Sequence, residues 1–440
     1  MTESGQGLKV AYIAAGAGGM ICGSCIRDNA LVSELQREGL DALLIPIYTP
    51  LRTDEENVSS DRVFYGAINI YLQQKAPWLA KLPGVLRHLL DAPKLLSWVA
   101  GSADSTNAKE LGALTLSMLQ GESGRQKKEL EELVLWLRDS YKPDIVVLTN
   151  SMLLGMARSL RDKLPGARIL CALQGEDIFL DDLDEPWRTR VHDQLKARAK
   201  DCHLFLTTCD YYGEYMSDFL DIPAEKIHVA RLGINLQGFA RSSDPPAEPF
   251  TVGYLARICP EKGLHHLIEA FAEVVREIPT AQLRIAGYLG GRDAAYAERL
   301  RRRIKELDLE TSVDWVGEVD RQGKIDFLSS LHAFSVPTEY REPKGLSILE
   351  ALAVGVPVVL PEHGAFPEIL ERSGGGLLFP PGDARALAEQ LVQLSRDADL
   401  REQLGSAGCA GVARHFDVSA MARATIEGFE KARGFGAVAT

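Results

Sequence analysis

The sequence predicts an α/β protein built from two doubly wound parallel-sheet domains. Short apolar runs alternate with helical stretches in both halves of the chain, a pattern typical of parallel strands buried under helices. A Pro- and Ser-rich stretch at 241–249 has the composition of an interdomain linker. The length of 440 residues suits two large domains.

The first half begins with a strand-like run at 8–15, followed by a Gly-rich loop at 16–19 and a helical stretch at 28–38. A further apolar run follows at the spacing of a βαβ unit. This spacing predicts one parallel sheet with helices on both faces. The predicted strands of this half are 8–15, 42–47, 145–149, 168–173, 204–207 and 227–230.

The second half repeats the pattern after the linker. Between its first two strands, apolar residues recur at helical spacing and predict one amphipathic helix. These residues are Leu264, Leu267, Ile268, Phe271, Val274 and Val275. The predicted strands of this half are 250–255, 282–286, 313–316, 333–336 and 357–360.

The segment 51–139 interrupts this alternation, because only 63–70 has a strand pattern there. Its Leu-rich part, 78–99, carries mostly basic charges and has two interpretations. It is either a helical insertion that covers the first domain or lines its cleft, or a helix lying on an anionic membrane surface. Prolines that interrupt a long helix favour the first: Pro77, Pro83 and Pro93.

Composition excludes some classes of function. A net charge of -12 argues against a general nucleic-acid binder, which needs a basic face against phosphates. The first five residues do not have the pattern of a secretion signal, and no apolar run is long enough to span a bilayer. Seven cysteines suggest reduced thiols. We therefore expect a cytoplasmic protein, peripheral at the inner membrane face if 78–99 binds lipid.

The stretch 338–357 has the pattern of an anion site at the start of a helix. Pro343 and Gly345 make a turn after a strand, and the amides of Gly345, Leu346 and Ser347 then face outward at the positive end of the helix dipole. A diphosphate bound there would place its ribose near Glu350, about 7 Å further along the helix. Glu342 would lie on the other side of the phosphates, beside a sugar.

This stretch resembles the E-x₇-E signature of retaining GT-B glycosyltransferases of family 4, also called glycosyl transferases group 1. The resemblance covers nearly the whole chain, with further marks at 228–235, 374–383 and 416–422. It implies two Rossmann-like domains facing across a cleft. The acceptor-side domain would comprise 1–240 and a C-terminal helix at 418–435, and the nucleotide-sugar-binding domain would comprise 241–417.

The resemblance also implies roles for the segment 253–263. In the family, an Arg and a Lys five residues later clamp the donor diphosphate, and Arg257 and Lys262 match them. Arg chelates phosphate oxygens and Lys supplies a point charge, so both would neutralise the leaving group. Transfer in this family needs no enzyme nucleophile, and we expect no metal ion and no separate cofactor.

In the first domain, the loop containing Gly18 and Gly19 resembles the family's loop that approaches the donor phosphate and the acceptor. A Rossmann dinucleotide site is the alternative, but the second strand ends at 45–48 without the acidic residue that would hold a ribose. The pair Cys22 and Cys25 also has the local context of a redox pair. Packing beside the donor pocket is the favoured interpretation.

The stretch 173–177 departs from the family pattern. Where the family commonly has a His that contacts the donor sugar, this chain has Gln174, while Gly175 and Asp177 are kept. Gln bonds a hydroxyl but transfers no proton. Lys344 also stands where the family commonly has a small or apolar residue. The predicted catalytic residues are Glu342, Asp177 and Gln174.

The predicted function is transfer of a sugar from a UDP- or GDP-linked donor to a hydroxyl of a glycan, lipid or small molecule, with retention of configuration. Two alternatives stay open. Gln174 suggests a catalytically weak or silent nucleotide-sugar-binding protein, and the two cysteines suggest a thiol redox protein.

Overall fold

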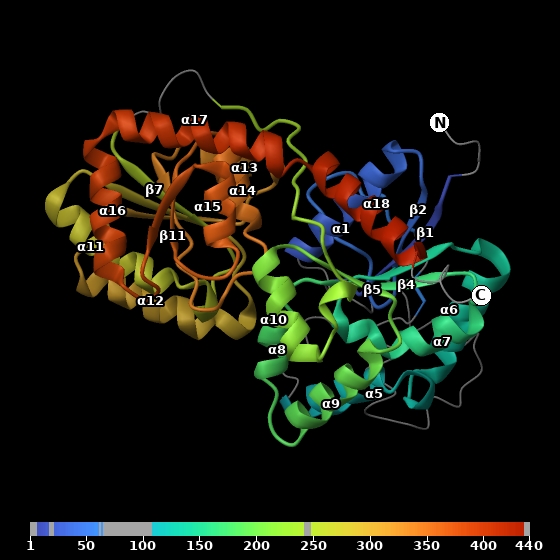
Figure 1. Cartoon of the computed structure of the whole chain (residues 1–440). Coiled ribbons are helices and arrows are strands. Elements are labelled where there is room, and N and C mark those ends of the chain that lie inside the picture. Colours follow the sequence, from blue (N-terminus) through green and yellow to red (C-terminus); the bar gives the residue numbers. More distant parts are fainter. Residues whose placement is uncertain (1–6, 17–21, 61–62, 65–107, 242–247, 435–440) are drawn as a thin grey trace. The chain divides into compact units, whose positions relative to one another are not determined.

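The computed structural model describes residues 7–16, 22–60, 63–64, 108–241 and 248–434. It divides the chain into two compact units (Figure 1). Unit 1 comprises Met1–Arg231 and Met421–Thr440, and unit 2 comprises Leu232–Ala420. Most of the predicted strand 63–70, the whole of 78–99, and Gly18 and Gly19 lie outside the described residues.

Unit 1 contains a parallel six-stranded sheet in the order β2-β1-β3-β4-β5-β6. The chain order reverses between β1 and β3, and ligands of open α/β sheets bind at such a point, beyond the carboxyl ends of the strands. The strands are β1 Lys9–Ala14, β2 Asp41–Pro46, β3 Ile145–Leu148, β4 Arg168–Leu173, β5 Leu204–Thr207 and β6 Ile227–Val229.

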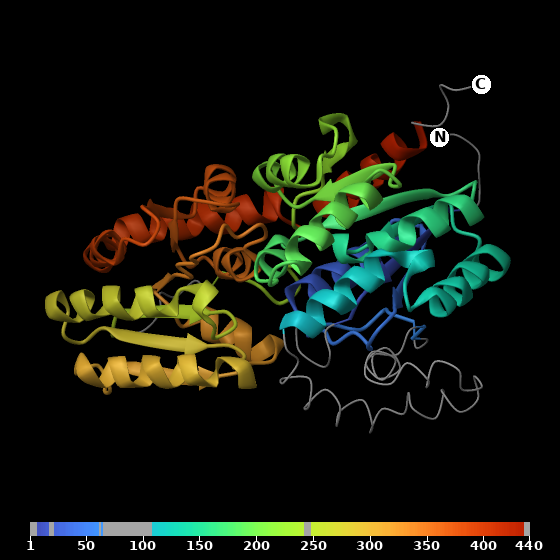
Figure 2. The same ribbon diagram turned by 90° about the horizontal axis from the view of Figure 1, so that it is seen from below.

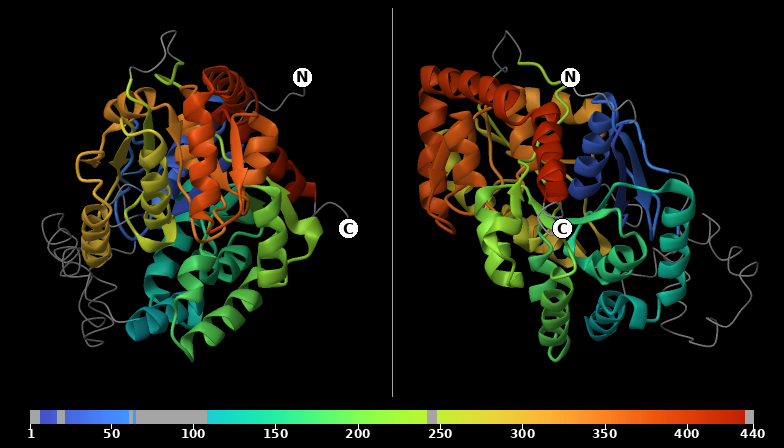
Figure 3. Two further views of the ribbon diagram at one scale, coloured as in Figure 1. Left: turned by 90° about the vertical axis from the view of Figure 1, so that its left-hand side faces the viewer. Right: turned by 45° about the vertical axis from the view of Figure 1, so that its right-hand side comes forward.

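The central strands of unit 1 are almost entirely buried, as expected for a parallel sheet covered on both faces. Figure 3 shows helices flanking the sheet of each unit. Those of unit 1 are α1 Gly23–Arg37, α5 Ala108–Leu119, α6 Lys127–Trp136, α7 Ala157–Lys163, α8 Asp177–Asp181, α9 Trp187–Ala199, α10 Asp210–Leu220 and α18 Val418–Gly434.

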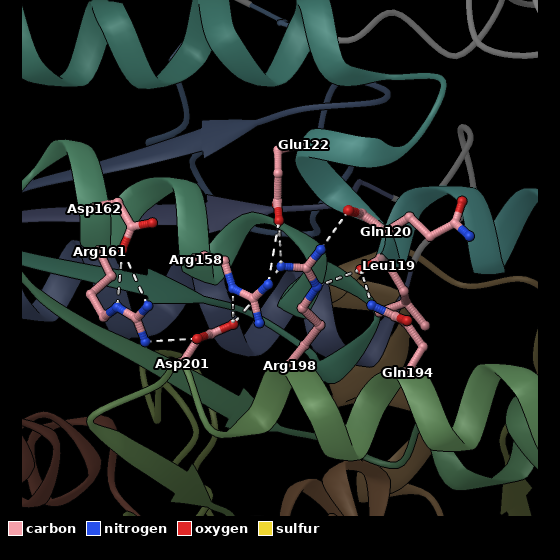
Figure 4. Close-up of polar contacts among 9 residues, drawn as sticks. All are labelled: Leu119, Gln120, Glu122, Arg158, Arg161, Asp162, Gln194, Arg198 and Asp201. Atoms are coloured by element: carbon pink, nitrogen blue, oxygen red, sulfur yellow. Dashed lines mark hydrogen bonds and ion pairs between the residues drawn. The ribbon is translucent and has the colours of Figure 1, made fainter.

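An arginine network joins α5 to α9 in unit 1 (Figure 4). The buried side chain of Arg198 donates to the carbonyls of Leu119 and Gln120, which end α5. It also pairs with Glu122 at 3.0 Å. The buried Asp201 accepts hydrogen bonds from two further arginines, Arg158 and Arg161. The network therefore ties the C-terminal end of α5 to α9.

Unit 2 contains a second parallel six-stranded sheet, in the order β12-β11-β10-β7-β8-β9. Its strands are β7 Thr251–Leu255, β8 Gln282–Ala286, β9 Val313–Gly317, β10 Ala333–Phe334, β11 Val358–Pro361 and β12 Gly376–Phe379. The predicted fold class, two doubly wound parallel sheets with flanking helices, is confirmed.

Helices cover both faces of this sheet (Figure 2). The apolar stripe predicted between the first two strands is the buried face of α11, with Phe271 fully buried. The helices are α11 Leu264–Glu277, α12 Ala294–Glu306, α13 Arg321–Ser329, α14 Leu346–Ala353, α15 Phe366–Ser373, α16 Ala384–Arg396 and α17 Ala398–His415.

The last helix, α18, begins in unit 2 and continues into unit 1 at Met421. Its buried side chains Phe429 and Ala432 pack in unit 1. Two polar contacts fix it beside β6: the His228 ring donates to the carbonyl of Ala424 at 2.7 Å, and the Lys431 ammonium donates to that of Ile227 at 3.1 Å. Residues remote in sequence thus complete the first unit.

Among the described residues, no helix has both the length and the apolar character needed to cross a bilayer.

Candidate functional site

An ion pair between a half-buried lysine and a buried glutamate lies where two neighbouring strands of unit 2 end. Lys262 follows β7 and Glu342 follows β10, and the Lys262 ammonium lies 2.5 Å from the carboxylate. Tyr340 joins the pair, because its hydroxyl contacts both the ammonium and the carboxylate. The structure therefore brings together the predicted residues Lys262 and Glu342 and adds Tyr340, which the sequence reasoning did not single out.

The environment of Glu342 keeps this side chain ionised. Burial alone would raise the pKa of Glu342, but the charge and hydrogen bond of Lys262 and the hydrogen bond of Tyr340 lower the pKa to about 2. Burial and the neighbouring carboxylate together raise the pKa of Tyr340 well above its usual value. At neutral pH Glu342 is a carboxylate and a poor proton donor. It can hold a cation, an amide or a hydroxyl.

A sharp turn leads from this pair into α14. Gly345 has φ +70°, a conformation that favours glycine, and directly precedes the helix. Its amide is directed at the Glu342 carboxylate at 3.4 Å, and the amide of Lys344 lies at 3.2 Å. The amides of Leu346 and Ser347 belong to the first turn of α14, where backbone amides have no carbonyl partner within the helix. These two amides stay candidates for the anion site predicted at the helix start, whereas the amide of Gly345 is directed at Glu342.

The second predicted carboxylate, Glu350, lies on the buried face of α14 and is only 5% exposed. Lys324 of α13, itself 7% exposed, forms an ion pair with it. The sequence reasoning missed this lysine, because Lys324 stands on a separate helix 26 residues away. Both carboxylates of the predicted signature therefore have a lysine partner.

Arg257 and Lys262 stand on one tight loop after β7. The loop ends at Gly263, with φ +69°, where a Cβ atom would lie 1.7 Å from the carbonyl oxygen of Pro337. Only glycine allows this loop to lie so close to the segment after β10. The Arg257 side chain is 40% exposed and lies 3.6 Å from Glu261. Its charge is therefore accessible to a ligand.

In unit 1, Gln174 follows β4, and its side chain is turned into the protein. The amide nitrogen donates to Asp28 at 3.0 Å and to the carbonyl of Thr149 at 2.7 Å, and the residue is 4% exposed. These bonds tie the end of β4 to α1 and to the end of β3. Glu176 reinforces this junction by accepting the amides of Ser151 and Gln174, each at 2.6 Å.

Asp177 begins α8 and remains half-buried. The Tyr212 hydroxyl lies 2.7 Å from Asp177 and 3.2 Å from Glu176, and it accepts the amide of Gly175. Burial and the charge of Glu176 raise the pKa of Asp177, although the Tyr212 hydrogen bond opposes them. A phenol thus joins two neighbouring carboxyl groups.

A buried polar cluster continues from Gln174 into α1. Arg27 is 1% exposed and donates to the Tyr12 hydroxyl at 2.8 Å and to Asp28 at 3.0 Å. The sequence reasoning missed Arg27, Asp28 and Tyr212. The available signal was two adjacent charged residues, Arg27 and Asp28, within the buried part of α1.

The two cysteines of the proposed redox pair lie at the start of α1. Cys22 is half-buried in an extended conformation just before the helix, and Cys25 is buried within it. No disulfide joins cysteines among the described residues.

Residues 239–410 match the protein family described as Glycosyl transferases group 1. A similar protein is the "Putative colanic acid biosynthesis glycosyltransferase WcaL" of Salmonella typhimurium, 32% identical over 46% of this chain and 50% of that protein. Another is the "Phosphatidyl-myo-inositol mannosyltransferase" of Mycobacterium tuberculosis, 31% identical over 50% of this chain and 56% of that protein. The chain thus matches about half the length of these curated relatives.

Solved structures resemble the whole chain. The sucrose-phosphate synthase of Thermosynechococcus elongatus has a TM-score of 0.70 at 20% identity, covering 98% of this chain and all of that one. Anabaena HepE in complex with UDP and glucose has a TM-score of 0.67 at 16% identity, covering 96% and 99%. The chain therefore has the GT-B fold and carries a glycosyl transferases group 1 domain.

Proposed function

We propose that this protein is a retaining glycosyltransferase that transfers a sugar from a UDP- or GDP-linked donor to an acceptor hydroxyl. The observation that carries the proposal is the convergence of Lys262, Glu342 and the start of α14 at the strand ends of unit 2. A ligand there meets lysine and backbone amides together with a carboxylate, which suits a diphosphate joined to a sugar.

The proposed chemistry is stabilisation of the leaving diphosphate. Arg257, Lys262 and the amides of Leu346 and Ser347 would take up the negative charge that develops as the glycosidic bond breaks. Glu342 would hold a sugar hydroxyl while it remains ionised. In the retaining scheme, the incoming hydroxyl and the leaving diphosphate share one face of the sugar, and no enzyme nucleophile takes part.

Glu350 is proposed to accept hydrogen bonds from the donor ribose. Its ion pair with Lys324 compensates for the cost of burying the carboxylate, whose oxygens would accept hydrogen bonds from the ribose hydroxyls. In unit 1, the proposed contributions are backbone approach by Gly18 and Gly19 and contact through Asp177. Gln174 would act by holding Asp28 and the end of β3 in place.

The test combines donor binding with donor turnover. UDP-glucose and GDP-mannose are titrated in a thermal-shift assay, and release of UDP or GDP is then measured with and without candidate acceptors. Lys262→Ala should lower turnover about 100- to 1,000-fold, by comparison with loss of one oxyanion-hole donor. Lys305→Ala, at an exposed lysine of α12 in the same unit, is the matched control. Unchanged turnover and UDP affinity in Lys262→Ala would refute the assignment of this loop.

A catalytically silent nucleotide-sugar-binding protein is the second candidate. The observation that favours it is the inward side chain of Gln174, which is occupied by Asp28 and Thr149. Both candidates bind a donor, but only the enzyme releases nucleoside diphosphate.

A glycan or lipid acceptor is proposed because the relatives are named for colanic acid biosynthesis and for mannosyl transfer to phosphatidyl-myo-inositol. A cytoplasmic location is part of the same proposal, as is membrane contact through 78–99. Co-sedimentation with phosphatidylglycerol vesicles tests the membrane contact. Reversing the charges of Lys81, Arg87 and Lys94 should abolish it.

A further inference from the structure

Two histidines and a glutamate converge beside the donor loop of unit 2. His265 and His266 stand in the first turn of α11, and Glu339 lies in the segment after β10. One carboxylate oxygen of Glu339 lies 2.9 Å from His265 Nε2 and 3.4 Å from His266 Nε2. We call these three residues the His–Glu triad.

The spacing of the triad fits a small metal ion. The three ligand atoms all lie within 4.8 Å of one another. Ligands bound tetrahedrally at about 2.0–2.1 Å from one ion are separated by about 3.4 Å. The two observed nitrogen–oxygen distances are close to this value, so small side-chain rotations would admit an ion. Imidazole and carboxylate ligands together are typical of zinc and related divalent transition metals.

A neighbouring tyrosine orients one ligand. The Tyr296 hydroxyl lies 2.8 Å from His265 Nδ1, and it also accepts the backbone amide of His265. If Nδ1 carries the proton, this N–H would donate a hydrogen bond to Tyr296. The lone pair of Nε2 would then face Glu339. Supporting bonds of this kind are usual around histidine ligands.

We propose that the His–Glu triad binds a divalent transition-metal ion of the zinc class. Three protein ligands leave a fourth position for water or another ligand. The ion would fasten together two segments that also carry the Lys262–Glu342 pair. These segments are already joined by a hydrogen bond from the backbone amide of Glu339 to the carbonyl of Glu261 in the donor loop. The site lies outside the proposed transfer chemistry and does not depend on it.

The test is calorimetric titration of the full chain with ZnCl2 at pH 7.5. Wild-type protein should bind one equivalent, and His266→Gln and Glu339→Gln should each bind it at least about 10-fold more weakly. Both side chains are partly exposed, so these variants spare the core. Tyr296→Phe should weaken binding about 10- to 100-fold by releasing His265. His415→Gln, at the end of α17, is the control and should bind as wild type does.

A second measurement separates the triad from the cysteines. With CoCl2 in place of ZnCl2, an ion held by nitrogen and oxygen gives visible absorption without a sulfur-to-cobalt charge-transfer band. That spectrum, lost in Glu339→Gln, supports the proposal. A charge-transfer band, no binding at all, or equal ZnCl2 affinity in wild type and both triad variants would overturn it.

Discussion

The two units carry acidic residues at equivalent places, the strand ends of a parallel sheet, but neutralise them differently. In unit 2, Glu342 and Glu350 are buried against Lys262 and Lys324. In unit 1, Asp177 and its neighbour Glu176 share a phenol and backbone amides. A lysine keeps a buried carboxylate ionised, whereas a phenol in a buried setting leaves the pKa of Asp177 raised.

The difference bears on which unit could accept an anionic ligand. Glu342 and Glu350 each have a lysine partner, so a diphosphate approaching the start of α14 would not meet these two carboxylates as uncompensated charges. The adjacent negative charges of Asp177 and Glu176 would repel a diphosphate, whereas their oxygens can accept hydrogen bonds from hydroxyls. This contrast agrees with the proposed division into a donor-binding and an acceptor-binding unit.

The largest expected effect comes from breaking the more buried lysine pair. Lys324→Met leaves Glu350 without its cation and should lower the free energy of unfolding by about 3–5 kcal/mol. The double variant Lys324→Met/Glu350→Gln should recover most of that loss, because no unpaired charge remains. Urea unfolding followed by circular dichroism measures both. A double variant no more stable than the single one would contradict the ion-pair explanation.

Removing the charge of Glu342 should affect activity more than folding. Glu342→Gln keeps the shape of the side chain, and we expect sugar transfer to fall on the order of 100-fold because positioning of the donor is lost. Glu176→Gln in unit 1 is the comparison and should act chiefly on stability, because Glu176 bonds backbone amides. Steady-state kinetics and thermal unfolding of both variants separate the two roles. Equal kinetic losses would remove the distinction between the units.

The shared phenol of unit 1 should make a smaller contribution. Tyr212→Phe leaves Gly175, Glu176 and Asp177 without a hydroxyl partner, and we expect about 1–3 kcal/mol of destabilisation. Adding Asp177→Asn should restore part of the loss by removing one charge from the site. Thermal and urea unfolding check this. A Tyr212→Phe protein as stable as wild type would show that the phenol is dispensable.

The smallest expected effect is on stability in mild acid, where the contributions of Glu342 and Asp177 should change in opposite directions. The lowered pKa of Glu342 stabilises the fold above its unfolded value of 4.5, and this contribution falls as the pH drops toward about 2. The raised pKa of Asp177 works the other way, since protonation above its ordinary 3.8 favours the folded state. Between pH 5 and 4 the Glu342 contribution should fall by less than about 1 kcal/mol.

This pH effect is measured as the stability difference between wild type and either Glu342→Gln or Asp177→Asn at each pH. As the pH drops, the first difference should shrink and the second should move in favour of wild type. Parallel changes in both differences would contradict the contrast between the units.

The sequence predicted the parts of the fold that depend on local pattern. The stripe of Leu264 and Phe271 forms the buried face of α11, and the turn at Gly345 starts α14 as expected. The partner of Glu350 was not predictable, because Lys324 reaches it only through the packing of α13 on α14. The inward orientation of Gln174 likewise depends on Asp28, 146 residues away.

The boundary between the two units also depends on contacts between distant segments. A linker composition at 241–249 suggested a division there, whereas the structure assigns 232–241 to unit 2. The Ile234 amide donates to the carbonyl of Phe416, and the Val418 amide donates to that of Ile234. Arg321 donates to the carbonyls of Asn235 and Gln237. These contacts join distant segments and leave no local pattern in the sequence.

The helix α18 has a consequence for the order of folding during synthesis. Unit 2 is one continuous stretch of chain, whereas unit 1 needs residues after Ala420 that leave the ribosome later than all of unit 2. N-terminal parts usually fold first as the chain emerges. Here the first unit to begin is the last completed, because Phe429 and Ala432 are added to its core only after all of unit 2 has been made. Until then, nascent unit 1 exposes the apolar surface that α18 later covers.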